Sequence, residues 1–72
     1  MSEPKTDTKL SVIAAERDQM LAERYHLELK VRVAKRIGND PKPFLEGLVQ
    51  IEAALDELAA IEQEVRQAEQ PQ

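Results

Sequence analysis

One short segment interrupts a chain that is otherwise compatible with helix. The six residues GNDPKP bring together glycine, asparagine, aspartate and two prolines, which no other part of the sequence does, and such clusters form turns. Gly38 can adopt the left-handed conformation that ends a helix, and Asp40 can cap the start of the next one. Pro41 and Pro43 then fall in the first turn of that helix, where a missing N–H breaks no hydrogen bond. The segment therefore predicts an all-α hairpin of two antiparallel helices.

Capping signals set the expected bounds of the two helices. An oxygen of Thr6, Asp7 or Thr8 can cap the first helix, and the cations Lys35 and Arg36 suit the negative end of its dipole. We expect a helical hairpin over residues 7–69, in which the first helix spans about residues 7–37, the turn 38–41 and the second helix about 42–68, with flexible tails at 1–6 and 70–72.

The second helix has a single apolar stripe. Its large apolar residues are separated by three or four positions, which places them on one side of a helix. The remaining positions are mostly acidic, and such a face is usually solvated. Gly47 costs about 1 kcal/mol relative to alanine in a helix, and it predicts a close contact between the two helices. The predicted contribution of this helix to the hairpin core is Phe44, Leu48, Ile51, Leu55, Leu58, Ile61 and Val65.

The first helix differs because it carries two apolar stripes. In LELKVRV, residues 27–33, every second residue is apolar; this is a strand pattern, but no turn signal precedes it, so a strand remains only the alternative. On a helix, at about 100° per residue, Leu29 and Val33 lie almost opposite Leu27. The core stripe, which can pack on the second helix, consists of Ile13, Met20, Leu27, Val31 and Ala34. The other stripe, which we call the outer seam, consists of Ala22, Tyr25, Leu29, Val33 and Ile37, and its line extends towards the start of the helix through Ala15 and Val12.

The outer seam predicts a partner chain. One side of the first helix is enough to form the hairpin, so the other side must meet something outside it. A chain of 72 residues without cysteine also lies near the size at which a single core barely offsets chain entropy. We therefore expect the coiled-coil-like hairpin to be completed by self-association or by a helix of another protein.

Charge favours an antiparallel hairpin and a protein partner. Residues 1–37 carry eight basic and six acidic groups, whereas residues 38–72 carry two and eight, so opposite charges can flank the contact between the helices. The net charge of −4 argues against nucleic acid or an anionic membrane as the main partner. The chain also lacks a long apolar run and the opening pattern of a signal peptide, so we expect a cytoplasmic protein without membrane insertion.

Two arginines interrupt the core stripe. Arg17 and Arg24 occur at core-type spacing between the apolar residues of the first helix. Either their side chains extend along the edge of the helix contact towards solvent, or they pair with acidic residues of a partner and fix its register.

No set of residues predicts catalysis. Glu23 and His26 have the Glu-x-x-His spacing of di-iron bundles, and a dimer could add Glu52 or Asp56. However, a pattern of common helical residues matches easily by chance. The sequence has no nucleophile-and-base set, phosphate-binding glycine loop or zinc cluster. We expect no enzyme activity, no metal and no cofactor.

A basic group near the turn leaves RNA binding as an alternative. Small helical bundles can bind RNA through such a face. The acidic second helix and the scarcity of stacking aromatics, which make up 3% of residues, argue against it. The basic residues are Lys30, Arg32, Lys35 and Arg36.

The start of the second helix resembles a known family. The segment DPKPFLEGLVQIEA, residues 40–53, has an Asp-Pro turn, then an aromatic residue and then an aliphatic-Glu-Ala run. In this pattern, its size and its two-helix layout, the chain is similar to the small E-type co-chaperones of type III secretion needle subunits. The resemblance implies a cytoplasmic, non-enzymatic protein that joins a second chaperone and keeps an aggregation-prone needle subunit unassembled until export. The matching residues are Asp40, Pro41, Phe44, Ile51, Glu52 and Ala53.

Three functions are therefore compatible with the sequence. The first is a non-enzymatic interaction protein that binds a partner helix through the outer seam, with a co-chaperone role implied by the resemblance. The second is a homo-oligomeric four-helix bundle with a structural role. The third is a small RNA-binding helical bundle.

Overall fold

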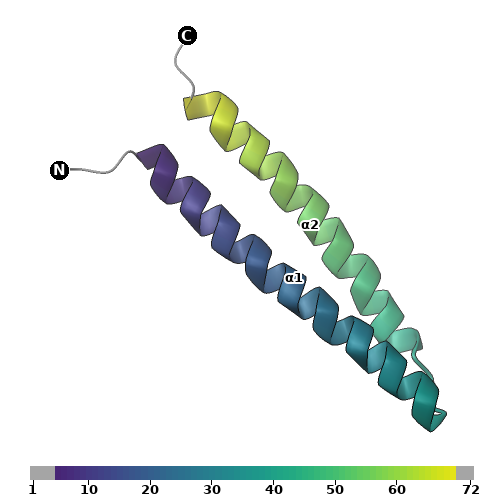
Figure 1. The fold of residues 1–72 in the computed structure, drawn as a ribbon. Helices are drawn as coiled ribbons and strands as arrows, with labels where there is room; N and C mark the ends of the chain where they lie inside the picture. The colour runs from purple at the N-terminus through teal and green to yellow at the C-terminus, as the bar shows by residue number, and fades with distance from the viewer. Residues whose placement is uncertain (1–4, 70–72) are drawn as a thin grey trace.

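The protein folds into two long helices that lie side by side and run in opposite directions. The computed structural model describes residues 5–69, in which α1 spans Lys5–Ile37 and α2 spans Lys42–Glu69. A short loop at residues 38–41 joins them, and the start of α1 lies beside the end of α2 at the other end of the rod (Figure 1). Residues 27–33 are helical, so the strand alternative is wrong. The described chain is an all-α antiparallel hairpin.

α1 begins earlier than the capping signals predicted. Two residues that the sequence placed in a tail are helical. Thr6, Asp7 and Thr8 lie inside the helix, so the prediction that one of them precedes and caps it is wrong. The remaining parts of the expected tails, residues 1–4 and 70–72, lie outside the described residues.

α1 ends in a hydrogen-bonded reversal centred on a glycine. Gly38 has a φ of 81°, a left-handed conformation that is unfavourable for residues with a Cβ. The N–H of Asn39 donates to the C=O of Ala34 over 2.8 Å, and the N–H of Gly38 donates to the C=O of Lys35 over 3.4 Å. This pair of bonds is the Schellman arrangement, and it satisfies two carbonyl groups that the end of a helix otherwise leaves open.

α2 begins with a side-chain cap and two prolines. Oδ1 of Asp40 accepts a hydrogen bond from the N–H of Lys42 over 3.0 Å, which is the interaction expected of a capping aspartate. The C=O of Pro41 accepts a bond from the N–H of Leu45 over 3.0 Å and thereby starts the helical ladder. Pro41 and Pro43 have no N–H, and at these positions no intrahelical bond is lost. Local residue chemistry thus determines both sides of the turn.

The contact between the helices follows a regular alternation of four and three residues. This is the heptad pattern of coiled coils, and it runs through positions 10–34 of α1 and 44–65 of α2. A contact between only two helices leaves most of these positions half open to solvent. The buried residues are Ile13, Val31, Ala34, Ile51 and Leu58, and the half-buried ones are Leu10, Arg17, Met20, Arg24, Leu27, Phe44, Leu48, Leu55, Glu62 and Val65.

One residue that the sequence assigned to the core faces solvent. Ile61 is 46% exposed, so its assignment to the core is wrong. The alternation continues from Leu58 to Glu62 and then to Val65, and Glu62 therefore faces α1 at the level where an apolar residue was expected. The physical reason is an ion pair between Glu62 and Arg17 of α1, which compensates the partial burial of the carboxylate.

α1 and α2 approach each other closely at Gly47. A Cβ at this position would lie 3.2 Å from Cδ2 and 3.3 Å from Cδ1 of Leu27. These distances are shorter than ordinary van der Waals contact between carbon atoms. The glycine therefore allows the Leu27 side chain to pack against the backbone of α2, as its place within a helix predicted.

Candidate partner-binding face

The outer seam is exposed along its length. Tyr25 is 57% exposed, Val33 55% and Ile37 64%, while Leu29 is less exposed at 37%. Ala22 is also exposed. α2 packs on the opposite side of α1 and leaves these side chains open. The hairpin therefore presents one unpartnered apolar face of a helix.

A groove near the turn deepens this face. It has a volume of about 380 Å³ and lies between the end of α1 and the start of α2. On one side of it, the Nζ of Lys30 lies 5.9 Å from the centre of the Phe44 ring, which is within cation–π range. His26 and Asn39 also contribute to the lining. The apolar part of the lining comes from Leu29, Val33, Ala34, Ile37 and Phe44.

A second, smaller hollow lies on the other flank of Leu29. Its volume is about 200 Å³. Because Leu29 lines both hollows, its side chain separates them as a ridge. A helix that lay along the outer seam could place side chains on both sides of this ridge. The lining residues of the second hollow are Tyr25, Glu28, Leu29, Val31, Arg32 and Leu48.

The structure also exposes apolar residues that were not expected at a partner face. Leu45 is 44% exposed and Val49 is 70% exposed on α2, and Leu21 is 38% exposed on α1. Val12, on the predicted extension of the outer seam, is 60% exposed. α2 is therefore not purely single-sided. The four-residue spacing of Leu45 and Val49, which places them one turn apart, is a signal that could have found them. The stronger core stripe of α2 obscured it.

Arg17 and Glu62 form an ion pair that joins the helices at the end remote from the turn. Glu62 Oε2 also accepts a hydrogen bond from Nη2 of Arg66 over 2.8 Å. The hydrogen bond from Arg66 and the charge of Arg17 lower the pKa of Glu62, although partial desolvation of the carboxylate opposes this shift. Arg17 thus pairs within its own chain, which neither of the two predicted arrangements anticipated.

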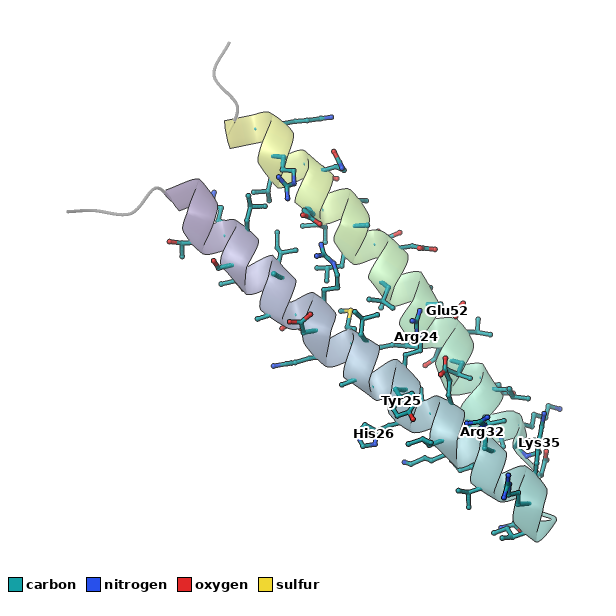
Figure 2. All side chains as sticks on the ribbon, in the orientation of Figure 1. Arg24, Tyr25, His26, Arg32, Lys35 and Glu52 are labelled. Atoms are coloured by element: carbon teal, nitrogen blue, oxygen red, sulfur yellow. The ribbon has the colours of Figure 1, made fainter. Side chains whose placement is uncertain are left out.

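Arg24 is the second arginine in the heptad pattern. Its side chain is 39% exposed, and its Nε lies 3.9 Å from a carboxylate oxygen of Glu28, one turn further along α1. Figure 2 shows the side chain extending from α1 towards α2 near Glu52. Arg24 therefore lies along the edge of the helix contact with its charged group accessible to water.

Charge is distributed unevenly along the rod. The end near the turn, residues 30–42, carries five basic residues and one acidic residue, and Arg32 and Lys35 are labelled there in Figure 2. The remote end, residues 8–23 of α1 and 56–68 of α2, carries seven acidic and three basic residues. The two ends of the hairpin therefore have opposite net charge.

The residues with metal-ligand spacing are not brought together. Within residues 5–69, no group of three or more histidine, cysteine, aspartate or glutamate residues is arranged to hold a metal ion. His26 points away from α2, whereas Glu52 lies on α2 (Figure 2). Glu52 therefore cannot complete a ligand set with His26 inside one hairpin.

Neither α1 nor α2, as described, contains a stretch long and apolar enough to cross a membrane. No family model, curated protein or solved structure matches the chain. The geometry of the outer seam and the distribution of charge are therefore the features of the hairpin that bear on its function.

Proposed function

We propose that this protein is a helical-hairpin interaction module whose outer seam binds a helix of another chain. The difference in exposure between the two sides of α1 supports the proposal. Val31, which packs against α2, is 9% exposed, whereas Val33 on the other side is 55% exposed. Single exposed apolar residues need no explanation, but an aligned set along a helix is typical of an interface. The usual solution for such a face is burial against another helix.

The exposed area sets the kind of partner that can bind. Full burial of a leucine, isoleucine or valine side chain contributes about 1.5–3 kcal/mol, and Leu29, Val33 and Ile37 are between 37% and 64% exposed. Covering these three therefore contributes roughly 2–5 kcal/mol. This is no more than the loss of translational and rotational freedom on binding. A stable complex must also fill the two hollows, which favours a long helix over a short peptide.

A co-chaperone for a type III secretion needle subunit is the specific role that the family resemblance favours. Asp40 caps α2 and Phe44 lines the larger groove, so two residues that carry the resemblance contribute to the turn and to the groove beside the outer seam. In this role the seam holds an aggregation-prone helix in the cytoplasm, together with a second chaperone, until export. Such holding requires burial of apolar surface and no catalytic residues.

A homo-oligomeric four-helix assembly is the second candidate. The opposite net charges of the two ends support it, because two hairpins that associate in opposite directions place unlike charges side by side. RNA binding would instead use the basic end, and its affinity would fall steeply with salt. The outer seam has no part in that function, so variants of the seam separate it from the first two.

A photo-crosslinking residue at Val33, introduced in the native host, tests the proposal, with the same residue at Val49 as the matched control. Both valines are exposed, but Val49 lies on α2 and outside the outer seam. We expect adducts with a second polypeptide at position 33 and a lower yield at position 49. Adducts with a different protein favour the chaperone role, and adducts between two copies favour the homo-oligomer. Equal yields at both positions, or no adduct at position 33, would contradict the proposal.

A further inference from the structure

We infer that a second copy of this chain covers the outer seam, with its α1 antiparallel to the first. The inference rests on the proposed function and names the occupant of the seam. Three features of α1 support it: exposed apolar residues on both halves of its outer side, a change in charge between these halves, and an acidic and a basic residue aligned on one line of the helix.

Exposed apolar side chains lie on the outer side of α1 in both directions from Leu27. Leu29, Val33 and Ile37 lie between Leu27 and the turn, and Leu21, Ala22 and Tyr25 lie on the side remote from the turn. In an antiparallel pair, each copy therefore packs the apolar residues of one half of α1 against those of the other half.

Charge divides α1 at the same place. An antiparallel pair places the acidic half of each helix beside the basic half of the other, whereas a parallel pair places like charges together. A different partner helix would need acidic residues beside the basic half of α1 and basic residues beside its acidic half. A second, antiparallel α1 provides this arrangement by symmetry. Arg17 and Arg24 lie in the contact with α2 and do not belong to this surface. The exposed charged residues are Glu28, Lys30, Arg32, Lys35 and Arg36 near the turn, and Lys9, Glu16, Asp18 and Glu23 remote from it.

Asp18 and Arg36 define the register of the pair. Each lies nine residues from Leu27, which is two and a half helical turns, so both point away from the side of α1 that meets α2. They therefore lie on one line along the helix, about 27 Å apart. If a twofold axis passes at the level of Leu27, Asp18 of each copy lies beside Arg36 of the other, and the ion pair occurs twice. Tyr25 and Leu29 are equally spaced about the same level and meet across the axis.

The overlap is long enough for a specific dimer. With the axis at the level of Leu27, residues 17–37 of the two copies lie alongside each other over about 30 Å. This overlap contains the entire outer seam. The result is a row of four helices in the order α2, α1, α1, α2, in which each hairpin keeps its own core.

Charge reversal tests both the occupant and its orientation. The dimer dissociation constant is measured by sedimentation equilibrium for the natural chain, Asp18→Arg, Arg36→Asp and the double variant. Each single reversal turns two attractions into two repulsions, and we expect it to raise the dissociation constant about tenfold. The double variant restores the pairs and should recover the natural value. Lys35→Asp is the matched control, because it makes the same change in the same turn but about 100° around the helix, and it should have little effect.

Introduced cysteines give a second readout of orientation, since the chain has none of its own. His26→Cys lies near the proposed axis, so a short bis-maleimide should link two copies efficiently. Ile37→Cys lies ten residues from the axis level, so its two copies are about 30 Å apart in the antiparallel dimer and should not be linked. Efficient linking at position 37 would show a parallel pair and overturn the inference, as would a double charge variant no tighter than the single ones.

The failure of this inference can be told apart from failure of the proposed function. A chain that is helical and monomeric at every concentration overturns the inference. If that monomer still forms adducts with a different protein at position 33, the proposed function stands with another occupant. If it forms no adduct at position 33, both are overturned.

Discussion

Val31 and Val33 are two residues apart in α1 but belong to different surfaces. Val31 packs against α2 and is 9% exposed, whereas Val33 lies on the outer seam and is 55% exposed. The same residue type thus has two roles, which depend only on the side of the helix that it occupies. Apolar alternation inside a helix therefore indicates two apolar surfaces: the core stripe forms the hairpin, and the outer seam remains exposed.

The core stripe by itself provides little burial. Among the described residues, no large side chain is completely buried, which is expected for a contact between only two helices in so short a chain. Covering the outer seam would bury the second side of α1 as well. We therefore expect the stability of the hairpin to rise with the concentration of whatever occupies the seam.

The largest expected difference is between two single variants that place an aspartate on opposite sides of α1. Val31→Asp puts a carboxylate into the helix contact, and we expect it to lower the free energy of unfolding by about 3 kcal/mol or more, which removes most of the helicity. Val33→Asp should keep the helicity of the monomer and weaken association. Far-ultraviolet circular dichroism at one fixed concentration compares them. Similar loss of helicity in both variants would refute the distinction between the two sides.

A smaller effect on stability is expected at the turn, which brings α1 and α2 into contact but is not part of the outer seam. Gly38 has a positive φ, and a Cβ added there would meet no atom within 4 Å, so the penalty for Gly38→Ala arises from the backbone alone. We expect a loss of about 1 kcal/mol in the free energy of unfolding by urea. Gly38→Asn is the control and should cost less, since asparagine tolerates this conformation better. Equal stability of the alanine variant and the natural chain would contradict the role of the turn.

Glu62 should give the core stripe a measurable dependence on acid. Its pKa is lowered in the folded chain, first by the hydrogen bond from Arg66 and also by Arg17. Its contribution to stability is therefore complete above the ordinary value of about 4.5 and is lost as the pH falls through the lowered pKa. Glu62→Gln should lose less stability than the natural chain between pH 5 and pH 3 in urea titrations. Glu64→Gln, at an exposed position, is the control, and an unchanged acid slope in Glu62→Gln would count against the ion pair.

The smallest net effect is expected where the two helices are closest. Gly47→Ala gains about 1 kcal/mol in helix propensity, but the added methyl group would lie 3.2 Å from Cδ2 of Leu27, so the two contributions should nearly cancel. In a Leu27→Val background the Cδ atoms are absent, and the same substitution should then raise the free energy of unfolding by about 1 kcal/mol. An equal gain in both backgrounds would mean that the contact is not tight. Thermal unfolding of the four chains measures this difference.

The sequence predicted best the features that depend only on residues close together in the chain, such as the turn and its caps. Gly38 and Asp40 act on backbone groups within five residues, so their chemistry can be read locally. The sequence could not show in this way that Glu62 rather than Ile61 faces α1. That outcome depends on Arg17, which is distant in sequence and comes close to Glu62 only in the hairpin. Leu29 and Val33 were placed on an outer seam from their angular positions alone. What covers them cannot follow from one chain, because the energy of that contact depends on a second.

We propose that the outer seam of α1 is a helix-binding interface that the hairpin itself does not need. The most direct test is sedimentation equilibrium with circular dichroism on the same samples, for the natural chain and for the Leu29→Lys, Val33→Lys double variant over a wide concentration range. We expect the natural chain to associate, and the variant to be monomeric with its helicity largely kept. A variant that associates like the natural chain, or one that loses its helicity completely, would contradict the account.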